Sequence, residues 1–289
     1  MQKMLSYLRQ CTDQYQMIGD GDRIAVGVSG GKDSLTLLLL MSALREFYPR
    51  RFTLEAITLD MGGHDDFSPI AQFCETIGVR YTIVPTQIRQ IVFDVRKEKN
   101  PCALCAKLRR GALNDAGVSL GCSKVALGHH FDDAVETFLL SLFYEGRISC
   151  FEPVTHLERT GLTVIRPLLY MKESEIVRFA SRQALPICKS TCPADKETRR
   201  EEIKTLVRSL EKQYRCLREH IFGAMQRYPL EGWAPIDPRA EWLKAHPAQK
   251  QQRRQAEGAS QSHDGGIDPV EAKAHAEPAA QAVEQPEDA

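Results

Sequence analysis

The sequence predicts an α/β protein with a Rossmann-like parallel sheet and helices on both faces. Short apolar runs rich in β-branched residues alternate with helical patterns, which is typical of βαβ units. Two of these runs lead directly into polar loops, at the position where open parallel sheets bind ligands. The 289 residues allow a sizeable core, and no apolar run approaches the roughly 18 residues of a membrane span.

The order of the predicted elements follows from this alternation. Strands are expected at 23–28, 53–59, 80–84, 124–127 and 163–166. Helices are expected at 35–44, 70–77, 104–116, 134–143 and 173–183, with a long charged helical stretch over 197–226. The chain then divides into a helical N-terminal segment (1–21), a nucleotide-binding domain with C-terminal helices (22–235) and a tail (236–289).

The tail differs from the rest of the chain in composition. It is rich in Ala, Gln, Glu and Pro and has few large apolar residues, so we expect it to be disordered. It holds 6 Lys and Arg against 10 Asp and Glu, and because the whole chain has 38 of each, the remainder carries 32 against 28. The zero net charge therefore does not exclude a nucleic-acid partner.

The N-terminus and the cysteine count predict the cellular setting. The first 16 residues are polar where a secretory signal would be apolar, which favours a cytoplasmic protein with no membrane partner. Nine cysteines, an odd number, favour metal ligands, catalytic thiols or core residues over a disulfide framework.

The strongest local motif is VSGGKDS at residues 28–34, between a predicted strand and an apolar helix. Glycines let the backbone approach a ligand closely, and a helix N-terminus presents free N–H groups to an anion. The segment predicts a phosphate-binding loop. It is not a Walker A loop, because only three residues separate Gly27 from Gly31 and an Asp follows Lys32. The alternative is a glycine-rich turn with a solvated lysine.

A second motif, GHHFDD at residues 128–133, follows another predicted strand and precedes a helix. Asp132 and Asp133 fall near the first helical turn, where carboxylates offset the helix dipole or hold Mg²⁺ beside phosphate. A plain acidic N-cap is the alternative. Asp60 also follows a predicted strand, at a position where a carboxylate is more often a turn or cap residue.

Two pairs of cysteines stand out. Cys102 and Cys105 open a predicted helix, where thiolates are favoured, and Cys188 and Cys192 follow about 85 residues later. These thiols suit a redox pair, a zinc site, or an iron–sulfur cluster that three thiolates hold with one iron left open. Spacing alone does not choose among these sites. The other cysteines are interpreted as packing or surface residues: Cys11, Cys74, Cys122, Cys150 and Cys216.

The SGGKDS segment resembles the PP-loop of the ATP pyrophosphatase superfamily, and over roughly residues 22–227 the motifs in order resemble the TtcA-type tRNA 2-thiocytidine synthetases. The resemblance implies a PP-loop domain that binds ATP with Mg²⁺. It assigns pyrophosphate binding to Ser29, Gly30, Gly31, Lys32, Asp33 and Ser34. It assigns further nucleotide contacts to Asp60, Gly128, His129, Asp132 and Asp133.

For the cysteines, the resemblance implies a 4Fe–4S cluster held by Cys102, Cys105 and Cys192. The downstream pair has C-x3-C spacing where the family has C-x2-C, so Cys188 remains the alternative ligand. The implied reaction adenylates the C2 oxygen of a cytidine at tRNA position 32, with Lys32 and Asp33 at the catalytic centre. Sulfur carried on the cluster then expels AMP; a persulfide on Cys102 or Cys105 is the alternative chemistry.

The remaining expectations concern partners. A cysteine desulfurase or sulfide would supply sulfur, and the family resemblance implies a homodimer. Basic segments at 50–51, 107–110 and 196–204 are candidates for tRNA phosphate contacts, with Arg109 and Arg110 favoured because they lie one turn beyond Cys105.

Three competing functions remain in view. One is thiolation of another base, such as uridine, by the same machinery. Another is lysidine synthesis, which shares the PP-loop but needs no three metal-binding thiols. The last is a non-catalytic ATP- or cluster-binding regulator, against which the intact SGGKDS, Asp60 and GHHFDD motifs argue.

Overall fold

The computed structural model describes residues 1–62, 66–96, 101–188, 199–228 and 232–233. These residues belong to one compact unit, Met1–Pro238. The predicted tail at 236–289, the boundary at 235 and the predicted ligand Cys192 lie outside the described residues.

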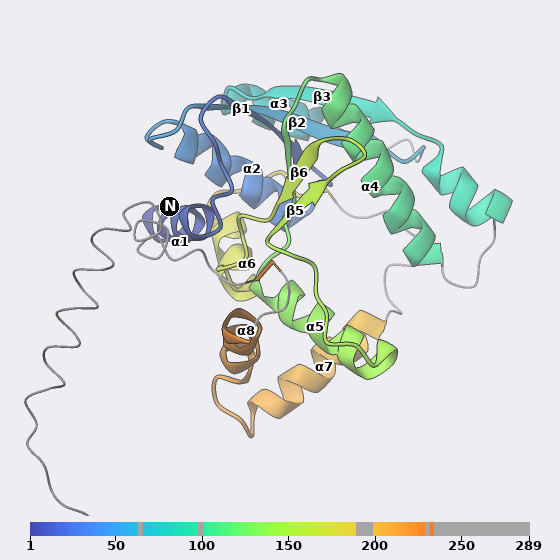
Figure 1. Cartoon of the computed structure of the whole chain (residues 1–289). Helices are drawn as coiled ribbons and strands as arrows, with labels where there is room; N and C mark the ends of the chain where they lie inside the picture. Colours follow the sequence, from blue (N-terminus) through green and yellow to red (C-terminus); the bar gives the residue numbers. More distant parts are fainter. Residues whose placement is uncertain (63–65, 97–100, 189–198, 229–231, 234–289) are drawn as a thin grey trace, which may run out of the picture. The chain divides into compact units, whose positions relative to one another are not determined.

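A six-stranded sheet with the order β3-β2-β1-β4-β6-β5 forms the centre of the fold (Figure 1). Its strands are β1 (Asp22–Gly27), β2 (Phe52–Asp60), β3 (Arg80–Pro85), β4 (Lys124–Ala126), β5 (Val154–Leu157) and β6 (Leu162–Ile165). Every pairing is parallel except that of β5, which runs antiparallel to β6 at the sheet edge. The predicted parallel sheet is therefore confirmed. The sequence analysis missed β5, because this short strand at the sheet edge is only partly buried and has no apolar run.

The helices match the predicted segments except near the C-terminal end of the described chain. They are α1 (Gln2–Gln14), α2 (Lys32–Arg45), α3 (Ser68–Thr76), α4 (Pro101–Ser119), α5 (Phe131–Glu145), α6 (Glu173–Arg182), α7 (Arg199–Glu211) and α8 (Leu217–Arg227), with a π-helix, η1 (Gln90–Arg96), before α4. The charged stretch predicted as one helix is two, because Cys216 adopts a left-handed conformation with φ of +59°. No Gly or Pro marks that break in the sequence.

Helices cover both faces of the sheet, as predicted. Ile24 and Val26 of β1 pack into the larger apolar cluster with α1 and α2, whereas Ala25 packs into a smaller cluster with Leu113 of α4. Successive side chains of a strand point to opposite faces, so β1 is buried on both sides and reads as a continuous apolar run. Among the described residues, no helix is long and apolar enough to cross a membrane.

The strand order explains where the two polar motifs meet. From β1 the chain moves outward to β2 and β3, then returns to β4 on the other side of β1. The segments that leave β1 and β4 therefore diverge from neighbouring carboxyl ends, which is the position of the ligand crevice in doubly wound sheets. Residues 28–31 connect β1 to α2, and residues 127–130 connect β4 to α5. Because α4 joins β3 to the parallel strand β4, it begins on this same side of the sheet.

Candidate active site

The loop between β1 and α2 is an open anion cradle. Gly30 has φ of +78°, a conformation that favours glycine, and its backbone is buried. The Ser29 N–H donates to Ser34 Oγ at 3.1 Å, and Ser34 Oγ donates to the Gly31 carbonyl at 3.0 Å. Gly31 is the N-cap of α2 and supplies no side-chain cap. The first N–H groups of α2 are therefore available to a phosphate.

The second motif lies directly against this loop. A Cβ placed on Gly128 would lie 3.1 Å from both the carbonyl carbon of Asp33 and the nitrogen of Ser34, so any larger residue would push the two loops apart by a few tenths of an ångström. Asp33 Oδ1 is buried in the same region and has no hydrogen-bond partner among the described residues. A buried acceptor without a partner is rare in folded proteins, so this oxygen fits a site that a ligand completes.

Lys32 is held by two carboxylates at the mouth of the loop. Its Nζ lies 3.1 Å from Asp33 Oδ2 and 3.2 Å from Glu173 Oε1, and the other oxygen of Glu173 lies 2.8 Å from Nζ of Lys204. Partial burial lowers the pKa of Lys32, but the two carboxylates outweigh it and raise the pKa. Burial raises the pKa of Glu173, but the Lys204 hydrogen bond and the Lys32 charge bring it to about 2. Both groups are charged near neutral pH.

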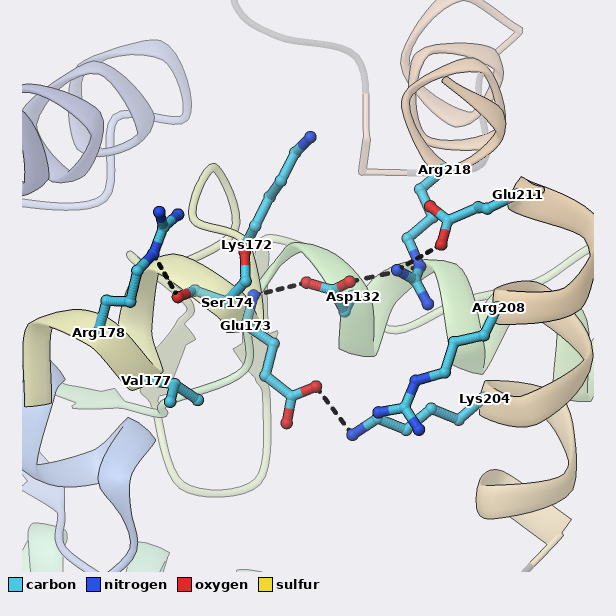
Figure 2. A pocket seen from close by; sticks show the side chains of 10 residues that line it. All are labelled: Asp132, Lys172, Glu173, Ser174, Val177, Arg178, Lys204, Arg208, Glu211 and Arg218. Atoms are coloured by element: carbon cyan, nitrogen blue, oxygen red, sulfur yellow. Dashed lines mark hydrogen bonds and ion pairs between the residues drawn. The ribbon is translucent and has the colours of Figure 1, made fainter. Parts of the chain in front are cut away.

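Asp132 of α5 has polar contacts with α6 and α8 (Figure 2). Its Oδ2 accepts a hydrogen bond of 2.6 Å from the Glu173 N–H at the start of α6, and its Oδ1 lies 3.3 Å from Nε of Arg218 on α8. The carboxylate is buried, and both oxygens have protein partners. Binding of Mg²⁺ or nucleotide by Asp132 remains a prediction.

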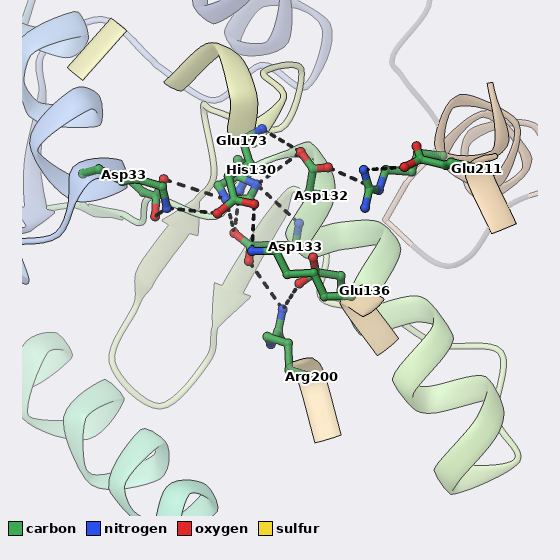
Figure 3. A network of polar contacts seen from close by, with 11 residues as sticks. Asp33, His130, Asp132, Asp133, Glu136, Glu173, Arg200 and Glu211 are labelled. Atoms are coloured by element: carbon green, nitrogen blue, oxygen red, sulfur yellow. Dashed lines mark hydrogen bonds and ion pairs between the residues drawn. The ribbon is translucent and has the colours of Figure 1, made fainter. Parts of the chain in front are cut away.

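Asp133 caps α5 together with His130. The His130 N–H donates to Asp133 Oδ2 at 3.0 Å, and the Asp133 N–H donates to His130 Nδ1 at 3.4 Å, which forms a capping box. Arg200 of α7 lies 3.4 Å from Asp133 and 3.5 Å from Glu136 (Figure 3). Burial raises the pKa of Glu136 although Arg200 lowers it. Arg200 belongs to a segment that we expected to contact tRNA, but in the structure its guanidinium contacts α5.

His129 is a neutral packing residue of the second motif. Its ring stacks on Phe151 with centroids 4.8 Å apart, and the guanidinium of Arg166 lies 4.9 Å from the centroid of the Phe151 ring. Burial, reinforced by the charge of Arg166, lowers the pKa of His129 to about 4. His129 Nδ1 is buried and has no hydrogen-bond partner among the described residues. The imidazole is therefore uncharged at neutral pH, and contact of His129 with the nucleotide remains a prediction.

Cys188 borders the cradle, whereas Asp60 is held in a turn after β2. Asp60, at the end of β2, accepts a hydrogen bond of 2.8 Å from the Gly62 N–H, the turn contact expected for a carboxylate after a strand. The Cys188 N–H donates to the Gly30 carbonyl at 3.0 Å. A Cβ on Gly30 would lie 3.1 Å from the Cβ of Cys188. The alternative cluster ligand is therefore packed against the phosphate loop.

Cys102 and Cys105 lie at the start of α4. Their i, i+3 spacing places both thiols on one helix face, with Cys102 exposed and Cys105 half-buried. Exposed thiols at a helix N-terminus are suited to bind iron as thiolates, so these two residues fit part of a cluster site. Across the described ranges, no group of three potential metal ligands is assembled, so Cys102, Cys105 and Cys188 do not form one, and Cys192 lies outside these ranges. Burial raises the pKa of Cys74 to about 11 and of Cys150 to about 12, as in packing thiols.

The sequence analysis missed Glu173, Phe151, Arg166 and Arg218 as components of this region. Glu173 had one local signal, its place in the first turn of a predicted helix that follows a strand. Nothing in the local sequence shows that this turn reaches Lys32, because the contact depends on how α6 packs on α2.

The fold and the loop define a PP-loop nucleotide-binding protein. A family model described as a PP-loop domain matches residues 4–210. The tRNA-cytidine(32) 2-sulfurtransferase of Pelobacter propionicus is 39% identical over 215 residues, which cover 73% of this chain and 80% of the relative. The protein of that name from Alkalilimnicola ehrlichii is 39% identical over 232 residues, or 78% of this chain and 73% of the relative.

Among solved structures, the U34-tRNA thiolase NcsA from Methanococcus maripaludis, solved with its 4Fe–4S cluster, is 26% identical. It superposes with a TM-score of 0.66 over 78% of each chain. This chain belongs to the tRNA-cytidine(32) 2-sulfurtransferase family, and the resemblance to 2-thiocytidine synthetases is confirmed.

Proposed function

We propose that this protein is an ATP-dependent tRNA sulfurtransferase that replaces the C2 oxygen of a cytidine, at position 32 as in the names of its relatives, with sulfur. One observation carries the proposal. The loop before α2 has no side-chain cap, and it lies against Gly128 where β1 and β4 end, in a chain of this family. Such a cradle holds phosphates beside a polar crevice.

The residues of the loop have defined tasks in this proposal. N–H groups of Gly30 to Ser34 bind the β- and γ-phosphates, and the Lys32 ammonium offsets the negative charge that develops on the departing pyrophosphate. The C2 oxygen of the base attacks the α-phosphorus and forms an adenylate. Asp33, whose Oδ1 has no hydrogen-bond partner among the described residues and lies 3.8 Å from His130 Nε2, completes the polar wall of the crevice. Asp60 borders the adenosine side, as the family resemblance implies.

Sulfur delivery involves the cysteines. Cys102 and Cys105 would hold a 4Fe–4S cluster together with Cys192, and Cys188 is the alternative third ligand. When bound, the cluster supplies an open iron that carries sulfur. The C2–S bond then forms as the C2–O bond breaks, and the oxygen leaves with AMP. Sulfide would provide the sulfur directly, whereas a cysteine desulfurase would provide it as a persulfide, whose outer sulfur a thiol reductant must first reduce to the sulfide level. Asp132 and Asp133 both have protein partners in this structure, so neither offers a free carboxylate to Mg²⁺.

A second candidate is thiolation of a uridine. The observation that favours it is the similarity of this fold to NcsA, a U34-tRNA thiolase. Both reactions replace an oxygen at C2 of a pyrimidine. The position in which the tRNA binds would therefore decide whether a cytidine or a uridine reaches the ATP.

The test is a reaction of the anaerobically purified, iron-loaded protein with unmodified tRNA, ATP, Mg²⁺ and sulfide, followed by mass spectrometry of the nucleosides. We expect 2-thiocytidine, with equimolar AMP and pyrophosphate. Lys32→Ala should abolish product, whereas Lys212→Ala, an exposed lysine outside the site, should not. Formation of 2-thiouridine would support the second candidate, and ATP cleavage without any thionucleoside would refute both.

A further inference from the structure

A pocket of about 560 Å³ lies beside the PP-loop, where α6, α7 and α8 meet (Figure 2). Its lining combines cationic and anionic side chains. The cations are Lys172, Arg178, Lys204, Arg208 and Arg218, and the carboxylates are Asp132, Glu173 and Glu211. The pocket therefore has more positive than negative groups in a concave surface.

Three of the pocket cations form ion pairs with carboxylates of the protein. Arg218 lies 3.3 Å from Asp132 and 2.9 Å from Glu211, and Lys204 lies 2.8 Å from Glu173. Each of the three carboxylates therefore has a cationic partner, and Arg218 is shared by two of them. Lys172 pairs with Glu219, which lies outside the pocket lining.

Two arginines are left with uncompensated charge. Arg178 and Arg208 are exposed, and within the described residues neither forms an ion pair. Arg178 donates from Nε to the Ser174 carbonyl at 3.0 Å, and no hydrogen bond joins the outer N–H groups of its guanidinium to the described part of the chain. A guanidinium presents paired N–H groups that match phosphate oxygens, so these two side chains suit a phosphodiester.

We propose that this pocket binds successive backbone phosphates of the tRNA beside the nucleotide that is modified, because Arg178 and Arg208 lie on opposite sides of it (Figure 2). The inference rests on the proposed function, since it requires tRNA as the substrate. Glu173 connects the two sites, because its carboxylate lies between Lys204 in the pocket and Lys32 in the PP-loop. An RNA strand that presents its base to ATP on the PP-loop passes this pocket, and charge complementarity favours its phosphates there.

The pocket is a better candidate than several basic residues singled out in the sequence. Arg200 is directed to α5, and the guanidinium of Arg199 lies 4.8 Å from the centroid of the Tyr144 ring. Arg50 donates to the Ile18 carbonyl at 2.6 Å. These three arginines have structural partners, whereas Arg178 and Arg208 keep their charge available to a ligand.

The test compares two double variants with the same loss of charge. Arg178→Ala with Arg208→Ala removes the pocket arginines, and Arg182→Ala with Arg215→Ala removes two exposed arginines that do not line it. Binding of unmodified tRNA to the full-length, iron-loaded protein is measured at several salt concentrations, and ATP binding is measured in parallel. Thermal melting checks that each variant is folded.

We expect the pocket variant to bind tRNA about tenfold more weakly or worse, with the slope of log K against log salt concentration reduced by about 1–2. The control should stay within about twofold of the wild type, and ATP binding should not change in either. Replacing both pocket arginines with lysine should retain most of the affinity, because the positive charge remains.

The outcomes separate the pocket from the proposed function. If the wild type binds no tRNA, the proposed function fails and this inference fails with it. If the wild type binds tRNA and the pocket variant binds equally well, the pocket assignment is refuted while the function stands. Equal weakening in both double variants indicates diffuse charge and refutes the pocket. A folded pocket variant that loses ATP binding but keeps tRNA binding would make this a nucleotide subsite, which also refutes it.

Discussion

Lys32 of the phosphate loop and Glu173 at the start of α6 form an ion pair of 3.2 Å, and Glu173 simultaneously contacts Lys204 of α7 at 2.8 Å. One carboxylate thus joins three helices beside the nucleotide cradle. With a quarter of its side chain exposed, Glu173 is buried enough for these contacts to stabilise the fold but is still partly screened by water.

The first prediction concerns this carboxylate. Glu173→Gln should lower the free energy of unfolding at pH 7 by about 1–2 kcal/mol, because two partly buried ammonium groups lose their shared partner. The folded-state pKa of Glu173 is lowered to about 2, so its stabilisation is present above pH 4.5 and is lost as the pH falls towards 2. The difference in the free energy of unfolding between the wild type and Glu173→Gln, measured by urea unfolding, should therefore be smaller at pH 3 than at pH 7.

The matched control is Glu46→Gln, which removes an exposed carboxylate whose single ion pair within the described residues is with Arg45. It should change stability by less than about 0.5 kcal/mol. A Glu173→Gln effect as small as that of the control would mean that the shared carboxylate does not stabilise this junction.

The second prediction concerns the contact between the two loops. Gly128→Ala adds a Cβ about 3.1 Å from backbone atoms of Asp33 and Ser34, so the loops must separate. We expect a loss of about 1–3 kcal/mol in stability and a weaker affinity for ATP. Gly111→Ala is the control, because a Cβ there meets nothing within 4 Å, and in the middle of α4 it should be neutral or stabilising. Calorimetric ATP binding that is equal in both variants would contradict the expected closeness of the loops.

The third prediction uses the neutral imidazole of His129. Burial lowers its pKa from 6.5 in the unfolded chain to about 4, so between these values the unfolded state binds more protons than the folded state. Stability should therefore fall as the pH drops from 7 to 5, by about 1–2 kcal/mol for this group. His129→Gln should reduce that loss, and replacement of the exposed His156 by Gln should not. An identical pH profile for all three proteins would show that His129 is not buried in solution.

The fourth prediction concerns the cysteines. Cys102→Ser or Cys105→Ser should abolish the iron content of protein prepared without oxygen, because each removes a proposed thiolate ligand. Cys216→Ser, at an exposed position away from the start of α4, should leave it unchanged.

The third ligand is tested by a separate pair of variants. We expect Cys192→Ala to lose the cluster and Cys188→Ala to retain it. A full complement of iron in Cys192→Ala, with loss in Cys188→Ala, would transfer the role to the cysteine that packs against Gly30.

The sequence by itself determined the parallel sheet, the phosphate loop and the family. Apolar periodicity, glycine placement and motif order are local properties, and they act through backbone geometry that neighbouring residues specify. Only the tertiary structure decided which polar groups share the site. Glu173 contacts Lys32 because α6 packs on α2, and Asp132 contacts Arg218 because α8 packs on α5. Such contacts depend on the packing of helices that are far apart in the sequence. A buried carboxylate needs a partner, but the adjacent sequence does not show which residue it is.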